Sequence, residues 1–138
     1  MADLKSLIKV RKHDVEQRQK QLAKLYRQDE DLIEKKQSLH DKVEKERTAM
    51  KTMDSQMQQY FGPFADAIKK QVLKIDERRE TLAKQITIAR EAMRDAFAEM
   101  KKVEISQENR DTEEANERNR ADTKRLDDIG VERFGRKS

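Results

Sequence analysis

Tyr60-Phe61-Gly62-Pro63-Phe64 is the main interruption in an otherwise highly charged chain, because it holds the only proline and one of three glycines. Proline removes a helical hydrogen bond, clashes with the preceding turn and pushes the residue before it out of the helical region. Gly62 suits the end of one helix, and Pro63 suits the first position of the next. The stretch therefore predicts a hairpin turn at residues 61–64.

The residues before this stretch repeat apolar side chains at heptad spacing, which is typical of a coiled coil. One seam position holds Ile8, Val15, Leu22, Asp29, Lys36, Val43, Met50 and Met57, and the other holds Leu4, Arg11, Arg18, Leu25, Leu32, Leu39, Glu46, Met53 and Tyr60. Most of these positions are apolar, although only 34% of the chain is hydrophobic. The pattern predicts a first helix over about residues 3–60, with Asp3 as its N-terminal cap.

A second unbroken heptad follows the interruption. Its seam positions hold Ala65, Ile68, Val72, Ile75, Arg79, Leu82, Ile86, Ala89, Met93, Ala96, Met100 and Val103. After Ile105 the apolar repeat stops, while the Glu, Arg and Lys content still favours a helix. We expect the second helix to cover about residues 65–129 and to end near Gly130. The remaining segment, residues 130–138, is predicted to be a mobile tail.

The two seams face each other when the chain is folded between Gly62 and Pro63. In that register Leu39 lies opposite Ile86, Val43 opposite Leu82, Met53 opposite Val72 and Leu25 opposite Met100. The isolated seam charges Glu46 and Arg79 also meet, which lowers the cost of placing each in a seam. The sequence thus predicts an all-α fold, a single antiparallel coiled-coil hairpin. Its turn half is expected to be firm, and its open end loosely held.

Composition and residue spacing exclude several classes of function. The chain has 138 residues, 43% of them charged, no cysteine and no apolar run long enough for a membrane span or a signal peptide. His13 and His40 are far apart in sequence and are expected to be solvated. We therefore predict no catalytic residues, no metal, no cofactor and a cytoplasmic location. The basic N-terminal run lacks interleaved aromatic residues, so no nucleic acid is expected as a partner.

Apolar residues at the open end have no apolar partners in the predicted register. Leu4, Leu7 and Ile8 recur at helical spacing near the N-terminus, and Leu126 and Ile129, with Phe134, form a second set near the C-terminus. Either the two sets pack on each other, or they form a docking surface that another protein completes. The second interpretation is the sharper hypothesis.

Both ends of the chain resemble the FliJ family of flagellar type III export proteins. The opening Leu4-x-x-Leu7-Ile8-x-Val10-Arg11-Lys12 is similar to the family's start. The ending Asp122-Thr123-Lys124-Arg125-Leu126-Asp127-Asp128, followed by Arg133 and Arg136-Lys137, is similar to its acidic-hydrophobic close and basic tail. A helical hairpin of about this size is also what the family forms.

The resemblance implies a non-enzymatic stalk for the hexameric export ATPase ring, much as the gamma stalk sits in the rotary ATP synthase. It also implies contacts with the export gate and with escort chaperones, at the base of the flagellar export apparatus and peripheral to its membrane-embedded part. The expected ring-binding residues are Leu4, Leu7, Ile8, Arg11, Lys124, Leu126, Asp127, Asp128, Ile129, Arg133 and Phe134. The alternatives are an injectisome stalk protein, a coiled-coil scaffold without an ATPase partner, and a nucleic-acid-binding helical arm.

Overall fold

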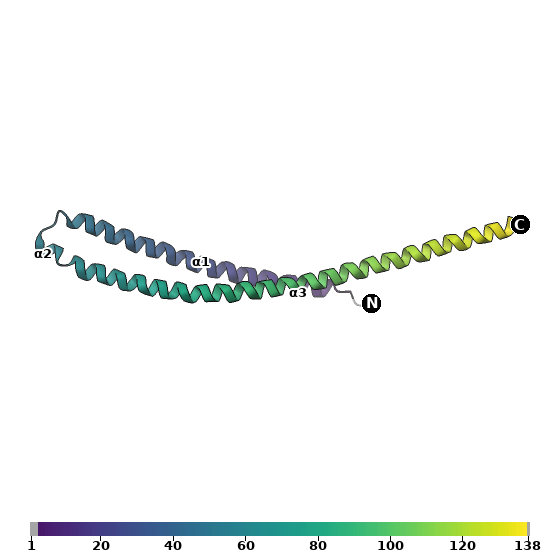
Figure 1. The fold of residues 1–138 in the computed structure, drawn as a ribbon, viewed down its shortest axis with the longest axis horizontal. Coiled ribbons are helices and arrows are strands. Elements are labelled where there is room, and N and C mark those ends of the chain that lie inside the picture. Colours follow the sequence, from purple (N-terminus) through teal and green to yellow (C-terminus); the bar gives the residue numbers. More distant parts are fainter. Residues whose placement is uncertain (1–2, 138) are drawn as a thin grey trace. The chain divides into compact units, whose positions relative to one another are not determined.

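The computed structural model describes the backbone of residues 3–137 and the side chains up to Arg133. Within these residues it contains three helices, α1 (Lys5–Met50), α2 (Ser55–Gln58) and α3 (Phe61–Lys137), and no strand. Contacts divide the chain into two units, residues 16–94 and residues 1–15 with 95–138. In the first unit α1 and α3 lie side by side and antiparallel, with α2 at the turn (Figure 1). The prediction of an all-α hairpin is confirmed.

The turn lies at residues 51–60, where polar side chains satisfy the backbone groups left free at the helix ends. The last turn of α1 tightens through bonds from each amide to the carbonyl three residues before it, such as Met53 N to Met50 O at 3.2 Å. The side-chain amide of Gln58 donates to the carbonyls of Met50 and Met53, each at 3.2 Å. Asp54 caps α2 by accepting from the amide of Met57 at 2.9 Å.

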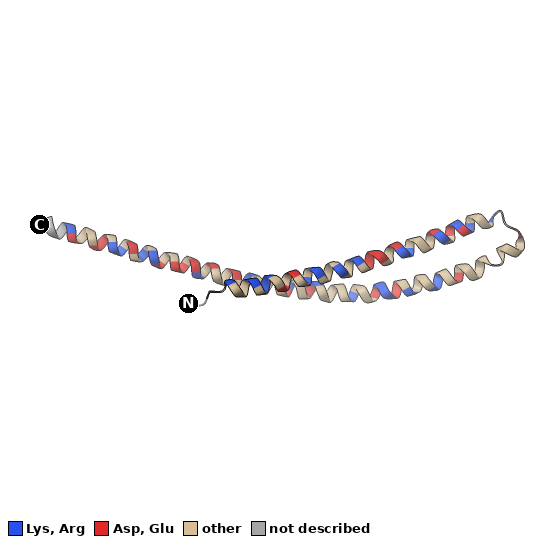
Figure 2. Cartoon of the chain, turned by 180° about the vertical axis from the view of Figure 1, so that it is seen from behind, with Lys and Arg blue, Asp and Glu red and all other residues tan. Residues whose placement is uncertain are grey.

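The predicted turn at residues 61–64 is therefore wrong. Phe61, Gly62 and Pro63 form the first turn of α3, where the missing amide of proline costs no helical hydrogen bond. No glycine that the structure describes has a positive φ, so Gly62 does not act as a helix terminator. Around α2 the chain carries few charges, as Figure 2 shows. The residues that stabilise the observed turn are Asp54, which caps α2, and Gln58, which donates to backbone carbonyls at and just after the end of α1.

Moving the turn changes the register of the two seams by two heptads. The core of residues 16–94 is a cluster of Leu25, Leu82 and Ile86, with the half-buried Leu22, Leu32 and Ala89 packed against it. Ile86 thus packs in the cluster of Leu25 instead of opposite Leu39, two heptads further along α1. The predicted pairing of Val43 with Leu82 is wrong for the same reason. Met53, expected in the seam, is exposed in the turn.

The seam charges find partners across the hairpin, but different ones from those predicted. Nε of Arg79 donates to Oδ1 of Asp29 at 2.9 Å, and Nζ of Lys36 donates to Oδ1 of Asp76 at 2.7 Å. Glu46, the predicted partner of Arg79, is exposed. The expectation that Arg79 has an acidic partner across the hairpin is confirmed, but the predicted partner is wrong. An unpaired charge in a seam is costly, which favours such pairing. The pairing itself follows the register set by the turn.

The start of α1 packs on α3 within the unit of residues 1–15 and 95–138. Val15, Ala96 and Met100 form a buried apolar cluster. The amide of Leu4 donates to Oε1 of Gln107 at 3.0 Å. Met100 was predicted to face Leu25, and this expectation is wrong. The two-heptad shift gives the N-terminal segment apolar partners.

From Asp111 onward α3 continues without a described neighbour from α1, and in Figure 1 it runs beyond the N-terminus of this unit. The side chains of residues 111–133 are exposed, apart from the half-buried Ala115 and Gly130. The predicted end of the helix near residue 129 is wrong, since α3 runs through Gly130 to Lys137. Glycine inside a helix costs only about 1 kcal/mol relative to alanine, and many Glu, Arg and Lys residues favour the helix. We call residues 111–137 the helical extension.

Candidate partner-binding surfaces

The N-terminal residues of the predicted ring-binding set lie on the first turns of α1. Leu4, Ile8 and Arg11 are half-buried, and Leu7 is exposed. Nε of Arg11 is buried and has no hydrogen-bond partner among the residues that the structure describes. A buried donor without a partner is unusual in a folded protein, because it loses its hydrogen bond to water.

The C-terminal residues of the predicted set lie on the helical extension. Leu126 and Ile129 are 68% and 44% exposed, so both side chains are accessible to a partner. The four charged members of the set, Lys124, Asp127, Asp128 and Arg133, are also exposed. Phe134 lies outside the described side chains. Leu126 and Ile129 stand one turn apart, so their side chains lie on the same side of α3.

The two predicted sets do not form one surface. The N-terminal set begins beside Gln107, to which Leu4 is bonded. Leu126 lies further along the same helix by about 28 Å, at 1.5 Å per residue. The interpretation that the two sets pack on each other is therefore wrong. What remains is a half-buried N-terminal set and a separate, exposed C-terminal set.

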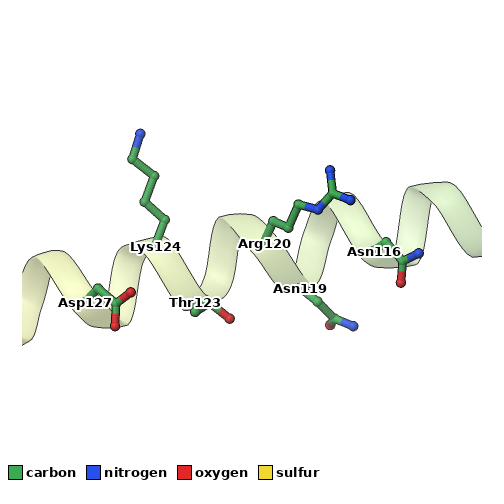
Figure 3. A pocket seen from close by; sticks show the side chains of 6 residues that line it. All are labelled: Asn116, Asn119, Arg120, Thr123, Lys124 and Asp127. Atoms are coloured by element: carbon green, nitrogen blue, oxygen red, sulfur yellow. The ribbon is translucent and has the colours of Figure 1, made fainter.

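A polar stripe that no apolar repeat reveals runs along one face of α3, from Asn109 into the helical extension. It holds Asn109, Thr112, Asn116, Asn119 and Thr123, at alternating spacings of three and four residues. A shallow hollow along part of this stripe is lined by the six residues whose side chains are drawn in Figure 3, namely Asn116, Asn119, Arg120, Thr123, Lys124 and Asp127. Side chains at this spacing share one helix face, so amides and hydroxyls line a surface that is uncharged along its middle. Such a stripe provides both donors and acceptors to a partner.

A second hollow lies between α1 and α3 near the turn, with a volume of about 500 Å³. Its floor is apolar, formed by Val43, Phe61, Ala65, Ile68 and Val72, and its rim holds His40, Glu44, Arg47, Lys69 and Leu73. The sequence did not predict this groove, because the centre of the predicted turn lies about seven residues too late and other residues were paired here. The heptads place Val43 and Ile68 in the two seams, but they do not show that these two residues lie next to each other in the hairpin.

The described residues contain no cluster of acidic, histidine or cysteine side chains able to hold a metal ion. None of their helices is both long and apolar enough to cross a membrane. The candidate sites are therefore surfaces on helices, formed by exposed apolar, amide and charged groups.

The antiparallel helices of residues 16–94 and the exposed helix of residues 111–133 define a class of helical proteins that present their functional groups along helix faces. Within that class the chain belongs to the FliJ family: a family model described as "Flagellar FliJ protein" matches residues 1–138. The protein is accordingly a component of flagellar protein export, in a family whose members are not enzymes. No curated protein and no solved structure matches the chain.

Proposed function

We propose that this chain is the coiled-coil stalk that binds and stimulates the ring of the flagellar export ATPase. On this proposal it also contacts the export gate and escort chaperones in the cytoplasm, at the base of the export apparatus. The observation that carries the proposal is the exposure of Leu126 and Ile129 on a helix that no other described segment covers. Family membership supports a role in export, and the helical extension supplies a free surface for it.

The geometry of the extension suits insertion into a ring. A single helix has a diameter of roughly 10–12 Å, narrower than a pair of packed helices. Burial of Leu126 and Ile129 against the ring stabilises the complex by about 1.5–3 kcal/mol for each fully buried side chain. That gain offsets part of the cost of association.

The test is the turnover of the export ATPase, titrated with the full chain and with a double variant, Leu126→Ser with Ile129→Ser. We expect the variant to lose most of its stimulation and its binding to the ring. Helix content and the thermal midpoint should stay close to those of the wild type, because neither residue is buried. A pull-down with nucleotide-loaded ATPase measures the binding of each variant to the ATPase independently of turnover.

Ile88→Ser with Ile33→Ser is the matched control, since these residues are 67% and 43% exposed and lie on the hairpin. This control should stimulate the ATPase like the wild type. Full stimulation by the extension variant would reject the docking role and leave a coiled-coil scaffold as the remaining function. Equal losses in both variants would show that apolar exposure in general, and not the extension, governs binding.

A further inference from the structure

One side of the hairpin of residues 16–94 carries two rows of side chains that together hold five Lys and Arg residues and one acid. The row on α1 is Asp31, Lys35, Ser38, Lys42 and Lys45, and the row on α3 is Ala67, Gln71, Lys74 and Arg78. Both rows alternate between spacings of three and four residues, so each follows one helix face. Lys35, Gln71, Lys74 and Arg78 line one groove between the helices, which places the two rows on the same side. We call these two rows the basic face.

The cations of the basic face are not neutralised by the hairpin itself. In the described part of the chain Lys35, Lys74 and Arg78 make no ion pair, and Lys42 lies over the ring of Phe64 with its Nζ 5.8 Å from the centroid. Lys74 and Arg78 stand four residues apart, where like charges repel and weaken the helix. The nearby acids Asp29 and Asp76 are engaged by the seam cations. Asp31 is the one acidic residue in either row.

The other side of the same hairpin carries more acidic than basic side chains. Its rows are Ile33, Gln37, His40, Glu44 and Arg47 on α1, and Asp66, Lys69, Leu73, Asp76 and Glu80 on α3. Several of these residues line the groove near the turn, and Leu73 is exposed there. Gln71 and Leu73 differ by about 200° around the helix axis at 3.6 residues per turn, so they point to opposite sides. The excess of positive charge therefore lies on one side of the hairpin, the basic face.

We propose that the basic face binds an anionic lipid surface, with the hairpin lying flat against the phosphates of the headgroups. A membrane surface attracts a row of exposed Lys and Arg side chains without needing a shaped pocket. A protein partner usually buries apolar anchors, but Leu32 and Ile75, the apolar residues of this groove, already pack in the seam. Single-stranded nucleic acid needs exposed aromatic rings for stacking, and Phe64 beside this face is half-buried under Lys42.

The test is co-sedimentation of the full chain with vesicles of phosphatidylcholine alone and of phosphatidylcholine with phosphatidylglycerol. We expect binding to the anionic vesicles only, and weakening as added salt shortens the screening length. The variant Lys35→Gln, Lys74→Gln, Arg78→Gln should lose on the order of 100-fold in partition coefficient. All three residues are exposed, so the helix content should not change.

A matched control, Arg47→Gln, Lys69→Gln, Arg94→Gln, removes the same charge from exposed positions on the other side of the hairpin. It should lose much less binding than the basic-face variant. If both variants lost the same amount of vesicle binding, the binding would depend on net charge and not on the basic face, and the proposal would be overturned. The proposal would also be overturned if the wild-type chain did not bind anionic vesicles at low salt. Binding to poly-glutamate but not to vesicles would overturn it as well, and would indicate an acidic protein as the partner. Vesicle binding needs no export ATPase, so this result is independent of the stalk function.

Discussion

Arg79 and Asp29 form the ion pair that marks the register of the hairpin, with Nε of Arg79 2.9 Å from Oδ1 of Asp29. The hydrogen bond to Asp29 raises the pKa of the Arg79 guanidinium above its ordinary value. A raised pKa favours the charged form, so its contribution to stability is complete below the ordinary arginine pKa. It is lost only as the pH rises through the still higher folded value. The pair therefore persists at all ordinary pH values, and charge substitution is the way to test it.

Exchanging the two charges should restore what each single change removes. Asp29→Arg places two cations together and Arg79→Asp places two carboxylates together, so each should lower the thermal midpoint. The double variant should recover most of the loss, because opposite charges face each other again. Circular dichroism melting measures the effect. Glu46→Arg is the control and should change little, and a rescue of Arg79→Asp by Glu46→Arg would favour the register that the sequence suggested.

Engineered cysteines should distinguish the two registers directly, because the natural chain has none. Leu25→Cys with Ile86→Cys should form an intramolecular disulfide under mild oxidation, since both residues lie in one core cluster. Leu39→Cys with Ile86→Cys should not, because position 39 lies about 21 Å further along α1. Non-reducing electrophoresis and peptide mapping report the crosslink. The opposite outcome, or crosslinked dimers alone, would contradict the structure.

Leu82 is the residue on which the stability of the hairpin depends most, because it is 0% exposed at the centre of its cluster. Leu82→Ala should reduce the free energy of unfolding by about 2–5 kcal/mol through lost burial and the cavity left behind. Leu73→Ala removes the same atoms from an exposed site and should cost within about 0.5 kcal/mol. Urea unfolding of both variants makes the comparison, and similar midpoints would disprove the assigned core.

Removing the helical extension should leave the rest of the fold intact. A chain ending after Arg110 keeps the cluster of Val15, Ala96 and Met100 and the bond from Leu4 to Gln107. Its thermal midpoint should match that of the full chain, because the described side chains of the extension are not buried. Its helical signal should fall in proportion to the residues removed. A large drop in the midpoint would mean that the extension packs on another part of the chain.

The heptads made the fold class predictable, and resemblance of the two ends made the family predictable. Apolar residues every three or four positions on both sides of one interruption leave few alternatives to an antiparallel helical pair. The predicted site residues Leu126 and Ile129 did prove exposed. The polar stripe of Asn116, Asn119 and Thr123 is equally visible in the sequence, but its spacing is not an apolar repeat and so does not follow from the heptads.

The sequence by itself determined that two seams meet, that their charges must be compensated and that the chain turns near its middle. It did not determine which heptad meets which, because a repeating seam matches itself equally well after a shift of seven residues. Only the tertiary structure decided this, through the contacts of Gln58 with the carbonyls of Met50 and Met53 and the cap at Asp54. Proline at the third position of α3 costs a helix nothing, so the most conspicuous residue of the sequence did not set the turn.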